Sequence, residues 1–284
     1  MLDISKPNYS IKKDIEFIFE SECIDIETLS KNTGLSKATL YEMMNGSYVS
    51  DISYEKLYSY IYDCGYRINR TREEFLRESK NLIVFHGSKE GLHVVDASGA
   101  RENCDFGKGF YLSESYSTAL QFVCENTNST IYSFVLNLTE LNVVKFDCSL
   151  DWMLTICYYR GTIKPFEKST LIKNLVKKIE GADVIIAPIA DNRMFYIMSL
   201  FANGDINSEV AVHSLSASNL GLQYVIKTEK ALKRLKPQEK YYLCSLEKIE
   251  CQKTLEKRVN EIETKLKMAR REYRNGLFVE EILK

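Results

Sequence analysis

The stretch DFGKGFYL at residues 105–112, preceded by FHGS at 85–88, gives the clearest indication of fold in this 284-residue sequence. Its two glycines, Gly107 and Gly109, allow a backbone to approach a ligand or a neighbouring strand closely, because neither carries a Cβ atom. The aromatic pair that follows them is typical of the start of a strand, and FHGS ends an apolar run that also predicts a strand. The glycines match neither a phosphate-binding loop nor a dinucleotide fingerprint, which need a longer pattern.

Around this stretch the sequence alternates between short β-branched or aromatic runs and helical ones. The runs that predict strands are 81–85, 131–138, 143–146, 183–187 and 223–226. The stretches with helical spacing are 116–124, 151–159 and 168–179. Strands and helices mixed in this way predict an α+β domain, which we place over residues 79–239.

The first part of the chain predicts short helices separated by turn residues. The helical stretches are 11–19, 25–33, 37–44 and 53–63, followed by a charged helical connector at 70–80. Gly34 ends the second helix and Ser36 caps the third. A short helix, a turn with glycine and a capped second helix have the spacing of a helix-turn-helix, so we expect an all-α helix-turn-helix domain over residues 1–78.

The stretch IETLSKNTGLSKATLYEMMNGS, residues 26–47, resembles the helix-turn-helix of the phage-repressor-like family. The resemblance implies that the helix after the turn, 37–44, would contact DNA. Residues 1–78, however, hold 10 Lys+Arg against 14 Asp+Glu, a net charge of −4, and Lys31 and Lys37 are the obvious basic residues near the turn. Two interpretations stay open: a DNA-binding domain, or a module for packing and protein contact.

The last part of the chain predicts a long C-terminal helix with one apolar stripe. The stripe consists of Leu246, Ile249, Leu255, Val259, Ile262 and Leu266, and Gly276 follows as the helix end. Residues 240–284 hold 11 Lys+Arg and 8 Asp+Glu, a net charge of +3. We expect this extension to pack on the domain or on a partner subunit, or to form a coiled coil. Its basic surface suits an anionic acceptor or the acidic N-terminal domain.

The composition excludes several classes of protein. With 38 Lys+Arg against 39 Asp+Glu, the chain has no basic excess for binding phosphates in general. No apolar run is long enough to span a membrane, and the charged N-terminus does not resemble a signal peptide, so we expect a cytoplasmic protein. The eight cysteines show neither CxxC spacing nor a paired histidine, which predicts reduced thiols and no metal site.

The two opening stretches, together with an alanine-containing helix at 117–123, are similar to the NAD-binding half of ADP-ribosyltransferases of the His-Tyr-Glu class. They resemble more closely a bacterial family of largely uncharacterised ADP-ribosyltransferase-like domains. Further matches lie at 151–152, 160, 182–194, 222–232 and near the C-terminus. The resemblance covers roughly residues 80–284. It implies a split β-sheet that binds NAD⁺ as a co-substrate, without a metal.

The resemblance also implies roles for individual residues. His86 matches the histidine that hydrogen-bonds the adenine-side ribose, and Tyr111 matches the tyrosine whose ring stacks on the cationic nicotinamide. The other residues expected to contact NAD⁺ are Gly87, Ser88, Gly109 and Phe110. The third residue of the class is a glutamate that opens a late strand, and the matching position here is Gln223.

Glutamine at this position changes what the site can do. An amide can hold a ribose hydroxyl, but it supplies no negative charge for the oxocarbenium-like centre that forms as nicotinamide leaves. Glu209 is a competing candidate for the third group; otherwise it is a charge at a helix N-terminus. Arg160, Asp191 and Arg193 are candidates for acceptor binding or for support of the site, and the last two also fit a helix-capping turn.

These features lead to three hypotheses for function. The first is a mono-ADP-ribosyltransferase that modifies a protein, RNA or DNA acceptor as a bacterial toxin or phage-defence effector. An antitoxin partner, or self-association, would use residues 1–78 or the C-terminal helix. The second is an NAD⁺- or ADP-ribose-binding module with weak catalysis, and the third is a DNA-binding regulator whose middle domain senses a ligand. None of the three involves a membrane.

Overall fold

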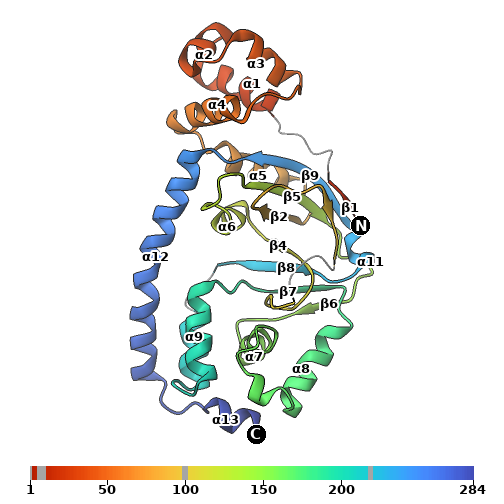
Figure 1. Ribbon diagram of the computed structural model, residues 1–284, viewed down its shortest axis with the longest axis vertical. Coiled ribbons are helices and arrows are strands. Elements are labelled where there is room, and N and C mark those ends of the chain that lie inside the picture. Colours follow the sequence, from red (N-terminus) through yellow and green to blue (C-terminus); the bar gives the residue numbers. More distant parts are fainter. Residues whose placement is uncertain (1, 5–10, 98–101, 217–219) are drawn as a thin grey trace.

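The computed structural model describes residues 2–4, 11–97, 102–216 and 220–284, apart from the side chains of residues 3, 192 and 258–262. It shows a mixed α/β protein in which helices surround a seven-stranded sheet (Figure 1). The N-terminal helices form one end of the molecule, and a long C-terminal helix runs along one side of it (Figure 1). The predicted mixture of strands and helices in the middle of the chain is confirmed.

The strands of the sheet follow the order β6-β7-β8-β4-β2-β5-β9. Their bounds are β2 Ile83–Ser88, β4 Phe110–Ser113, β5 Thr130–Leu136, β6 Val143–Lys145, β7 Val184–Pro188, β8 Leu222–Ile226 and β9 Leu235–Tyr242. Neighbouring strands are antiparallel, except that β6 and β7 are parallel. Among the described residues, β2 and β4 are in register at one pair only, Phe85 with Ser113. The sheet therefore has two halves, β6-β7-β8-β4 and β2-β5-β9, which meet at this pair.

Helices pack at the junction of the two halves and beside one of them. At the junction, α6 (Tyr116–Gln121) packs against β2 and β5 of one half and against β4 of the other. The helices beside β7 and β8 are α7 (Leu150–Tyr159), α8 (Thr170–Glu180), α9 (Asn192–Ala202) and α10 (Ser208–Ser216). Their shared core contains the fully buried Trp152 and Phe106. The shorter elements are β1 (Leu2–Asp3), β3 (Val94–Val95), η1 (Lys164–Phe166), α11 (Glu229–Leu232) and α13 (Val279–Leu283).

The N-terminal helices are α1 (Ile11–Glu22), α2 (Ile26–Thr33), α3 (Lys37–Met44), α4 (Asp51–Asp63) and α5 (Ile68–Glu78). Two of them, α2 and α3, have the capping residues that the sequence indicates, whereas α4 and α5 each begin two residues earlier than predicted. The carboxylate of Asp25 accepts a hydrogen bond from Thr28 N (2.8 Å), and Ser36 Oγ accepts one from Thr39 N (3.0 Å). Gly34 ends α2 with a φ of 64°, the left-handed region that glycine adopts without a steric cost.

Buried polar groups join these helices to the sheet and to the C-terminal helix. Arg72 Nε donates to Asp14 Oδ1 (3.0 Å), and Tyr58 OH donates to Asp14 Oδ2 (2.6 Å), which ties α5 to α1 and α4. Asn69 Nδ2 donates to Tyr116 OH (2.8 Å) and to Glu247 Oε2 (2.9 Å). These buried contacts connect the N-terminal helices to the rest of the protein, although among the described residues Asn69 Oδ1 and Arg72 Nη1 have no hydrogen-bond partner.

The C-terminal part differs from the prediction at its start. β9 continues the sheet to residue 242, so the expected boundary between 239 and 240 falls inside a strand. The sequence of β9, LKPQEKYY, carries charges and Pro237, which an edge strand tolerates because one row of its backbone groups has no neighbouring strand. These residues break the apolar pattern that marks the other strands, and the sequence analysis missed β9 for this reason.

The long helix α12 (Ser245–Glu272) packs along the protein itself and ends before Gly276. Its residues Leu246, Leu255 and Leu266 join three different apolar clusters, so the helix bridges the N-terminal helices and both halves of the sheet. The side chains of Val259 and Ile262, which complete the predicted stripe, lie outside the described residues. Within the described ranges, α12 included, no helix is both long and apolar enough to cross a membrane.

Candidate functional site

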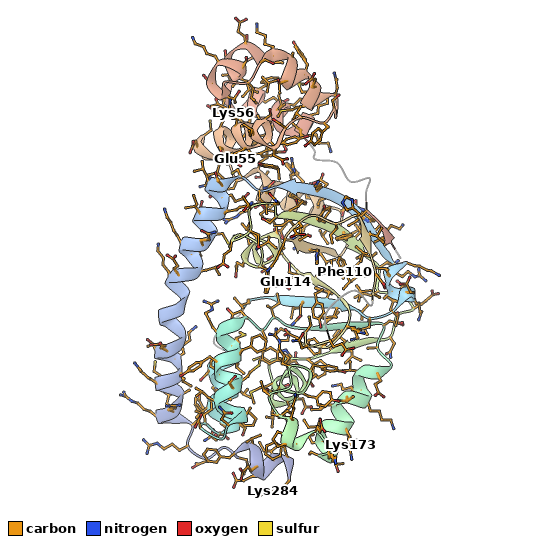
Figure 2. All side chains as sticks on the ribbon, viewed as in Figure 1. Glu55, Lys56, Phe110, Glu114, Lys173 and Lys284 are labelled. Atoms are coloured by element: carbon orange, nitrogen blue, oxygen red, sulfur yellow. The ribbon has the colours of Figure 1, made fainter. Side chains whose placement is uncertain are left out.

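Five of the predicted site residues, among them the three catalytic candidates, line one cavity where the two halves of the sheet meet. His86 comes from β2, Tyr111 from β4 and Gln223 from β8, and these strands are neighbours in the order β8-β4-β2. Phe110 and Glu114, which flank this part of β4, are labelled in Figure 2. The cavity has a volume of about 230 Å³. It is called the strand pocket below, and its other lining residues include Gly87, Cys104, Asp105, Ala119, Phe122, Arg160, Ile189 and Ala190.

His86 is held as a neutral imidazole. Its Nδ1 lies 2.7 Å from the backbone oxygen of Tyr111. Since a carbonyl oxygen only accepts, Nδ1 carries the hydrogen and Nε2 remains an acceptor. Burial lowers the pKa of His86, which keeps the ring uncharged. The ring also packs against Phe110, with 4.5 Å between the ring centroids, so its orientation in the strand pocket is fixed from two sides.

Tyr111 anchors the loop that precedes its own strand. Its hydroxyl donates to the backbone oxygen of Gly107 (2.7 Å) and accepts from Phe106 N (3.0 Å). Burial raises the pKa of Tyr111, so the hydroxyl stays protonated and able to donate. Gly107 has a φ of 71°, and a Cβ atom there would lie 3.0 Å from the ring of Tyr159. The DFGKGFYL motif therefore builds a tight loop closed by its own tyrosine.

Gln223 takes part in a chain of polar contacts that the sequence analysis did not foresee. Its Nε2 donates to Asp105 Oδ2 (3.0 Å) and to the backbone oxygen of Pro188 (3.0 Å). Arg160 donates to Asp105 Oδ1 from Nε (3.0 Å) and from Nη2 (2.6 Å), and its Cζ lies 3.5 Å from the centre of the Phe195 ring. The carboxylate of Asp105 is thus bound from both sides.

Asp105 is the buried charge of the strand pocket. The residue is 5% exposed, and burial raises the pKa of its carboxyl while Arg160 and Gln223 oppose that rise. Asp105 is the first residue of the DFGKGFYL motif, and no role was predicted for it. A carboxyl group directly before a tight glycine loop was the available signal, since a buried carboxylate needs partners and Arg160 was already a candidate.

Three residues predicted to contact NAD⁺ lie beside the strand pocket rather than in its lining. Ser88 Oγ donates to the backbone oxygen of Gly91 (2.7 Å), and Phe110 is buried beneath His86. At Gly109 a Cβ atom would lie 2.6 Å from Val225 Cγ1, so this glycine is required by the close approach of β4 to β8. We therefore assign these three residues to the support of the strand pocket.

Arg160 lines the strand pocket, but the other three candidates for acceptor binding or support do not. Asp191 caps α9 by accepting from Arg193 N (3.1 Å) and Met194 N (3.0 Å). Arg193 Nε donates to Asp191 Oδ2 (2.6 Å), so this pair is satisfied locally. Glu209 is exposed in the first turn of α10, where a carboxylate is favourable, whereas Gln223 lines the pocket.

The two basic residues near the predicted helix-turn-helix lie on the N-terminal helices, away from the strand pocket. Lys31 is in the last turn of α2, and Lys37 begins α3. Lys37 Nζ lies 3.0 Å from Glu27 Oε2, so its charge is paired on the protein surface. Because Lys37 is paired with Glu27, the start of α3 is less basic than the sequence around the turn indicates.

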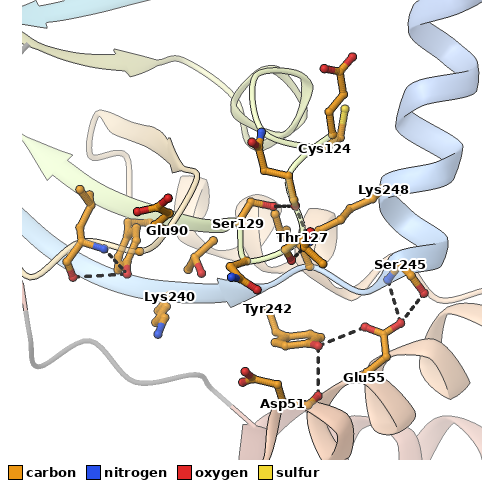
Figure 3. A pocket seen from close by; sticks show the side chains of 18 of the residues that line it. Asp51, Glu55, Glu90, Cys124, Thr127, Ser129, Lys240, Tyr242, Ser245 and Lys248 are labelled. Atoms are coloured by element: carbon orange, nitrogen blue, oxygen red, sulfur yellow. Dashed lines mark hydrogen bonds between the residues drawn. The ribbon is translucent and has the colours of Figure 1, made fainter. Parts of the chain in front are cut away.

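A second, larger cavity of about 880 Å³ lies between α4, β9, the start of α12 and the loops 90–93 and 124–130 (Figure 3). We refer to it as the α4–β9 groove. Glu55 accepts from Ser245 N (2.9 Å) and Tyr242 OH (3.1 Å), and Lys248 Nζ donates to the backbone oxygen of Thr127 (2.7 Å). None of the site residues predicted from the sequence lines this groove.

Neither cavity gathers the ligands of a metal ion. Across the parts of the chain that the structure describes, no group of three or more His, Cys, Asp or Glu side chains could hold one. In the strand pocket the donors and acceptors are instead an imidazole, a phenol, an amide and one carboxylate paired with Arg160. This set suits hydrogen bonding to an organic ligand with hydroxyl or amide groups.

The comparisons with known proteins assign the chain to a family. A family model described as "protein of unknown function (DUF3990)" matches residues 82–236, more than half of the chain. No curated protein and no solved structure matches the chain. The matched range contains every residue that lines the strand pocket. By this match, the chain belongs to the family of proteins of unknown function called DUF3990.

Proposed function

We propose that the protein is a mono-ADP-ribosyltransferase that cleaves NAD⁺ and transfers ADP-ribose to a macromolecular acceptor. The observation that carries this proposal is the meeting of His86, Tyr111 and Gln223 in one pocket. These residues are 25 and more positions apart in the sequence, and the resemblance to ADP-ribosyltransferases singles out the same three. Their convergence in a cavity of about 230 Å³ supports the resemblance by geometry that the sequence motifs do not contain.

The form of the sheet supports the same proposal. We propose that the two halves joined at Phe85 and Ser113 correspond to the split sheet of ADP-ribosyltransferases. The pocket lies at the junction of the halves, where α6 packs against β2, β4 and β5. We also propose that α2 and α3 form a helix-turn-helix, on the basis of their caps and the turn at Gly34.

The chemistry requires the bond between nicotinamide and the ribose C1′ to break, with the electron pair leaving on the nicotinamide nitrogen. A nucleophilic oxygen or nitrogen of the acceptor then bonds to C1′ and loses its proton to solvent. In the proposed arrangement the ring of Tyr111 stacks on the cationic nicotinamide, and His86 Nε2 accepts from a ribose hydroxyl. Phe122, Ala119 and Ile189 line the same pocket and give the reacting bond an apolar surrounding.

The second candidate function is an NAD⁺- or ADP-ribose-binding module with weak catalysis. The observation that favours it is the bonding of Gln223, whose amide group is held by Asp105 and Pro188 and carries no charge of its own. A pocket of this kind binds a ribose hydroxyl without stabilising the positive charge that develops at C1′. Tight binding of NAD⁺ in calorimetry without release of nicotinamide would identify this function.

The test compares the wild type with His86→Ala and with Lys240→Ala, a change in the α4–β9 groove. Incubation with NAD⁺ labelled in the adenosine part and with cell extract should label an acceptor and release nicotinamide. His86→Ala should lose at least about 100-fold in the rate of release, since it removes a hydrogen bond and opens the pocket to water. Lys240→Ala should keep the wild-type rate. No label and no nicotinamide from the folded wild type would overturn the proposal.

Growth of cells that express the same variants tests the proposed setting as a toxin or phage-defence effector. The wild type should slow growth and lower the NAD⁺ content of the cells, and His86→Ala should do neither. Labelled extract treated separately with protease and with nuclease distinguishes a protein acceptor from RNA or DNA. Normal growth beside active NAD⁺ cleavage in vitro would remove the toxin from the proposal and leave the transferase.

A further inference from the structure

The strand pocket contains the buried carboxylate of Asp105, which has no role in the active site proposed above from His86, Tyr111 and Gln223. We infer that Asp105 is a positioning residue that orients Gln223 and supplies the negative charge that glutamine lacks. The inference rests on the proposed function for its chemical meaning, but its geometry does not depend on that function. It changes the interpretation of Gln223 from a weakened glutamate to one member of a matched amide and carboxylate pair.

The orientation of Gln223 follows from its two partners. Asp105 Oδ2 and the backbone oxygen of Pro188 both lie 3.0 Å from the same end of the side chain. Both are acceptors, so this end must be the NH₂ group and the amide cannot be turned over. The carbonyl end, Oε1, accepts no hydrogen bond from the residues that the structure describes. It is therefore the end available to a ligand hydroxyl in the pocket that Gln223 lines.

Arg160 neutralises the negative charge of Asp105 only in part within the strand pocket, because the two side chains differ in their exposure to water. The side chain of Arg160 is 33% exposed and that of Asp105 is 7% exposed. Water therefore screens the guanidinium, while the carboxylate acts through a medium of low dielectric constant. The hydrogen bond from Gln223 to this carboxylate polarises the amide and makes Oε1 a stronger acceptor. Asp105 thus favours positive charge in the pocket without touching the ligand.

Arg160 keeps this carboxylate in place. Two of its nitrogens donate to Asp105 Oδ1, and its guanidinium lies flat over Phe195 of α9. The loop that carries Asp105 is also tied by the hydroxyl of Tyr111 to Gly107 and Phe106. The carboxylate is thus fixed from α7, α9 and β4, and its distance to Gln223 does not depend on a mobile side chain.

Because Gln223 and Asp105 form an amide–carboxylate pair, we expect a substitution at one of them to depend on the residue at the other. Gln223→Glu restores the residue of the His-Tyr-Glu class, but it places a second carboxylate at hydrogen-bond distance from Asp105 and opposite the oxygen of Pro188. Two carboxylates at this distance cannot both ionise cheaply. Exchanging the two groups, Asp105→Asn with Gln223→Glu, keeps one amide and one carboxylate and should remove the conflict. The other titratable side chains that line the pocket are His86, Cys104, Tyr111 and Arg160.

The first readout is thermal unfolding of the two single variants and the double variant between pH 5 and pH 8. Gln223→Glu should lower the unfolding temperature by about 5 °C or more at pH 8 and by less at pH 5, because the native state then holds an extra proton that the unfolded chain has lost. The double variant should recover at least half of that loss and show no such widening with pH. Additive effects of the two changes, or a Gln223→Glu variant as stable as the wild type at pH 8, would overturn the inference.

The second readout is the rate of nicotinamide release. Asp105→Asn should lower kcat at least about tenfold with at most about a threefold change in KM, Gln223→Glu should also lower it, and the double variant should approach the wild type within about threefold. An unchanged kcat in Asp105→Asn contradicts the positioning role.

Asp183→Asn is the matched control for both readouts. Asp183 is a buried carboxylate that accepts from Thr228 Oγ1 (2.7 Å) and pairs with Lys230 (3.0 Å), away from the pocket. It should lower the unfolding temperature and leave kcat unchanged. If the wild type neither binds nor cleaves NAD⁺, the proposed function fails, while the unfolding measurements still decide whether Asp105 and Gln223 are coupled.

Discussion

The two cavities of this protein differ in how their polar groups are held. In the strand pocket of about 230 Å³, a buried carboxylate accepts from Gln223 of β8 and from Arg160, which follows α7. In the α4–β9 groove of about 880 Å³, Glu55 and Lys248 bond to the walls of the groove and face an open space (Figure 3). In the smaller cavity the polar groups are bonded to one another around one buried carboxylate, whereas in the larger one Glu55 and Lys248 are bonded to separate partners.

This difference shows that the volume of a cavity does not indicate whether its residues are arranged for catalysis. Catalysis by charge and hydrogen bonds requires groups fixed before the ligand arrives, in a place from which water is excluded. The strand pocket meets the first condition because its groups lie on neighbouring strands and on a loop tied by Tyr111. The groove is built from a helix, a strand edge and two loops, so its shape depends on how the N-terminal helices are packed. Four predictions test this contrast.

The largest expected effect is on the packing of the N-terminal helices, of which α4 forms one side of the groove. Arg72→Ala leaves the buried carboxylate of Asp14 without its cation, and we expect a loss of about 3–5 kcal/mol in the free energy of unfolding. Urea unfolding at pH 7.5 measures it. Lys56→Ala, an exposed change on α4, should cost less than about 0.5 kcal/mol. A loss below about 1 kcal/mol for Arg72→Ala would show that the buried pair does not hold the N-terminal helices.

The second prediction breaks the strand pocket without touching the groove. Tyr111→Phe removes the acceptor of Phe106 N and the donor to Gly107, and we expect a loss of about 1–3 kcal/mol. The affinity for NAD⁺, measured by calorimetry, should fall as well, because the loop that carries Asp105 loses its anchor. Tyr158→Phe on α7 is the control and should change neither quantity. Equal effects of the two substitutions would speak against the anchoring role.

The third prediction concerns the floor of the strand pocket. In Gly87→Ala the new Cβ would lie 2.7 Å from the backbone oxygen of Ala119 and 2.9 Å from Val123 Cγ1, so α6 must shift. We expect a destabilisation of about 1–3 kcal/mol and a weaker affinity for NAD⁺. Gly181→Ala is the matched change, since its Cβ meets nothing closer than 3.7 Å. The prediction fails if both alanines are tolerated equally in urea unfolding.

The smallest expected effect is a pH dependence of stability. Burial lowers the pKa of His86, so below pH 6.5 the unfolded chain takes up a proton that the native state refuses, and stability falls as the pH falls. Unfolding temperatures at pH 7.5 and pH 5.5 measure the difference. His86→Asn should reduce it, and His93→Asn in the groove should keep the wild-type difference. An unchanged pH dependence in His86→Asn contradicts the burial of a neutral imidazole.

Much of the fold could be predicted because local chemistry determines it. The strands β2, β5, β6, β7 and β8 lie close to the β-branched runs, and α2 and α3 begin at the capping residues Asp25 and Ser36. β9 and α9 were not predicted, and the start of α10 was foreseen only as the alternative role of Glu209 at a helix N-terminus. β9 is an edge strand with charges in its sequence, and α9 was interpreted as a polar cluster because Asp191 and Arg193 stand at its start. In each case a tertiary position outweighed the local pattern.

The site shows the same division between local and distant information. His86 and Tyr111 stand in short motifs that a sequence reveals, whereas Asp105 and Gln223 are 118 positions apart. Their contact depends on the pairing of β4 with β8, in which Ser113 faces Gln223. A single sequence does not reveal which distant residues form such a pair. The only general indication was that the carboxylate of Asp105, if buried, would need a hydrogen-bonding or charged partner.

The single register pair between β2 and β4 has a mechanical consequence for the molecule. His86 belongs to one half of the sheet, and Tyr111 belongs to the other. The hydrogen bond from the imidazole to the backbone oxygen of Tyr111 therefore fastens the two halves where the strand ladder is shortest. A ligand that contacts both His86 and Tyr111 would form a second connection between the two halves at the same place. Filling the pocket should stiffen the whole sheet, and hydrogen exchange at the ends of β2 and β4 would report occupancy from outside the pocket itself.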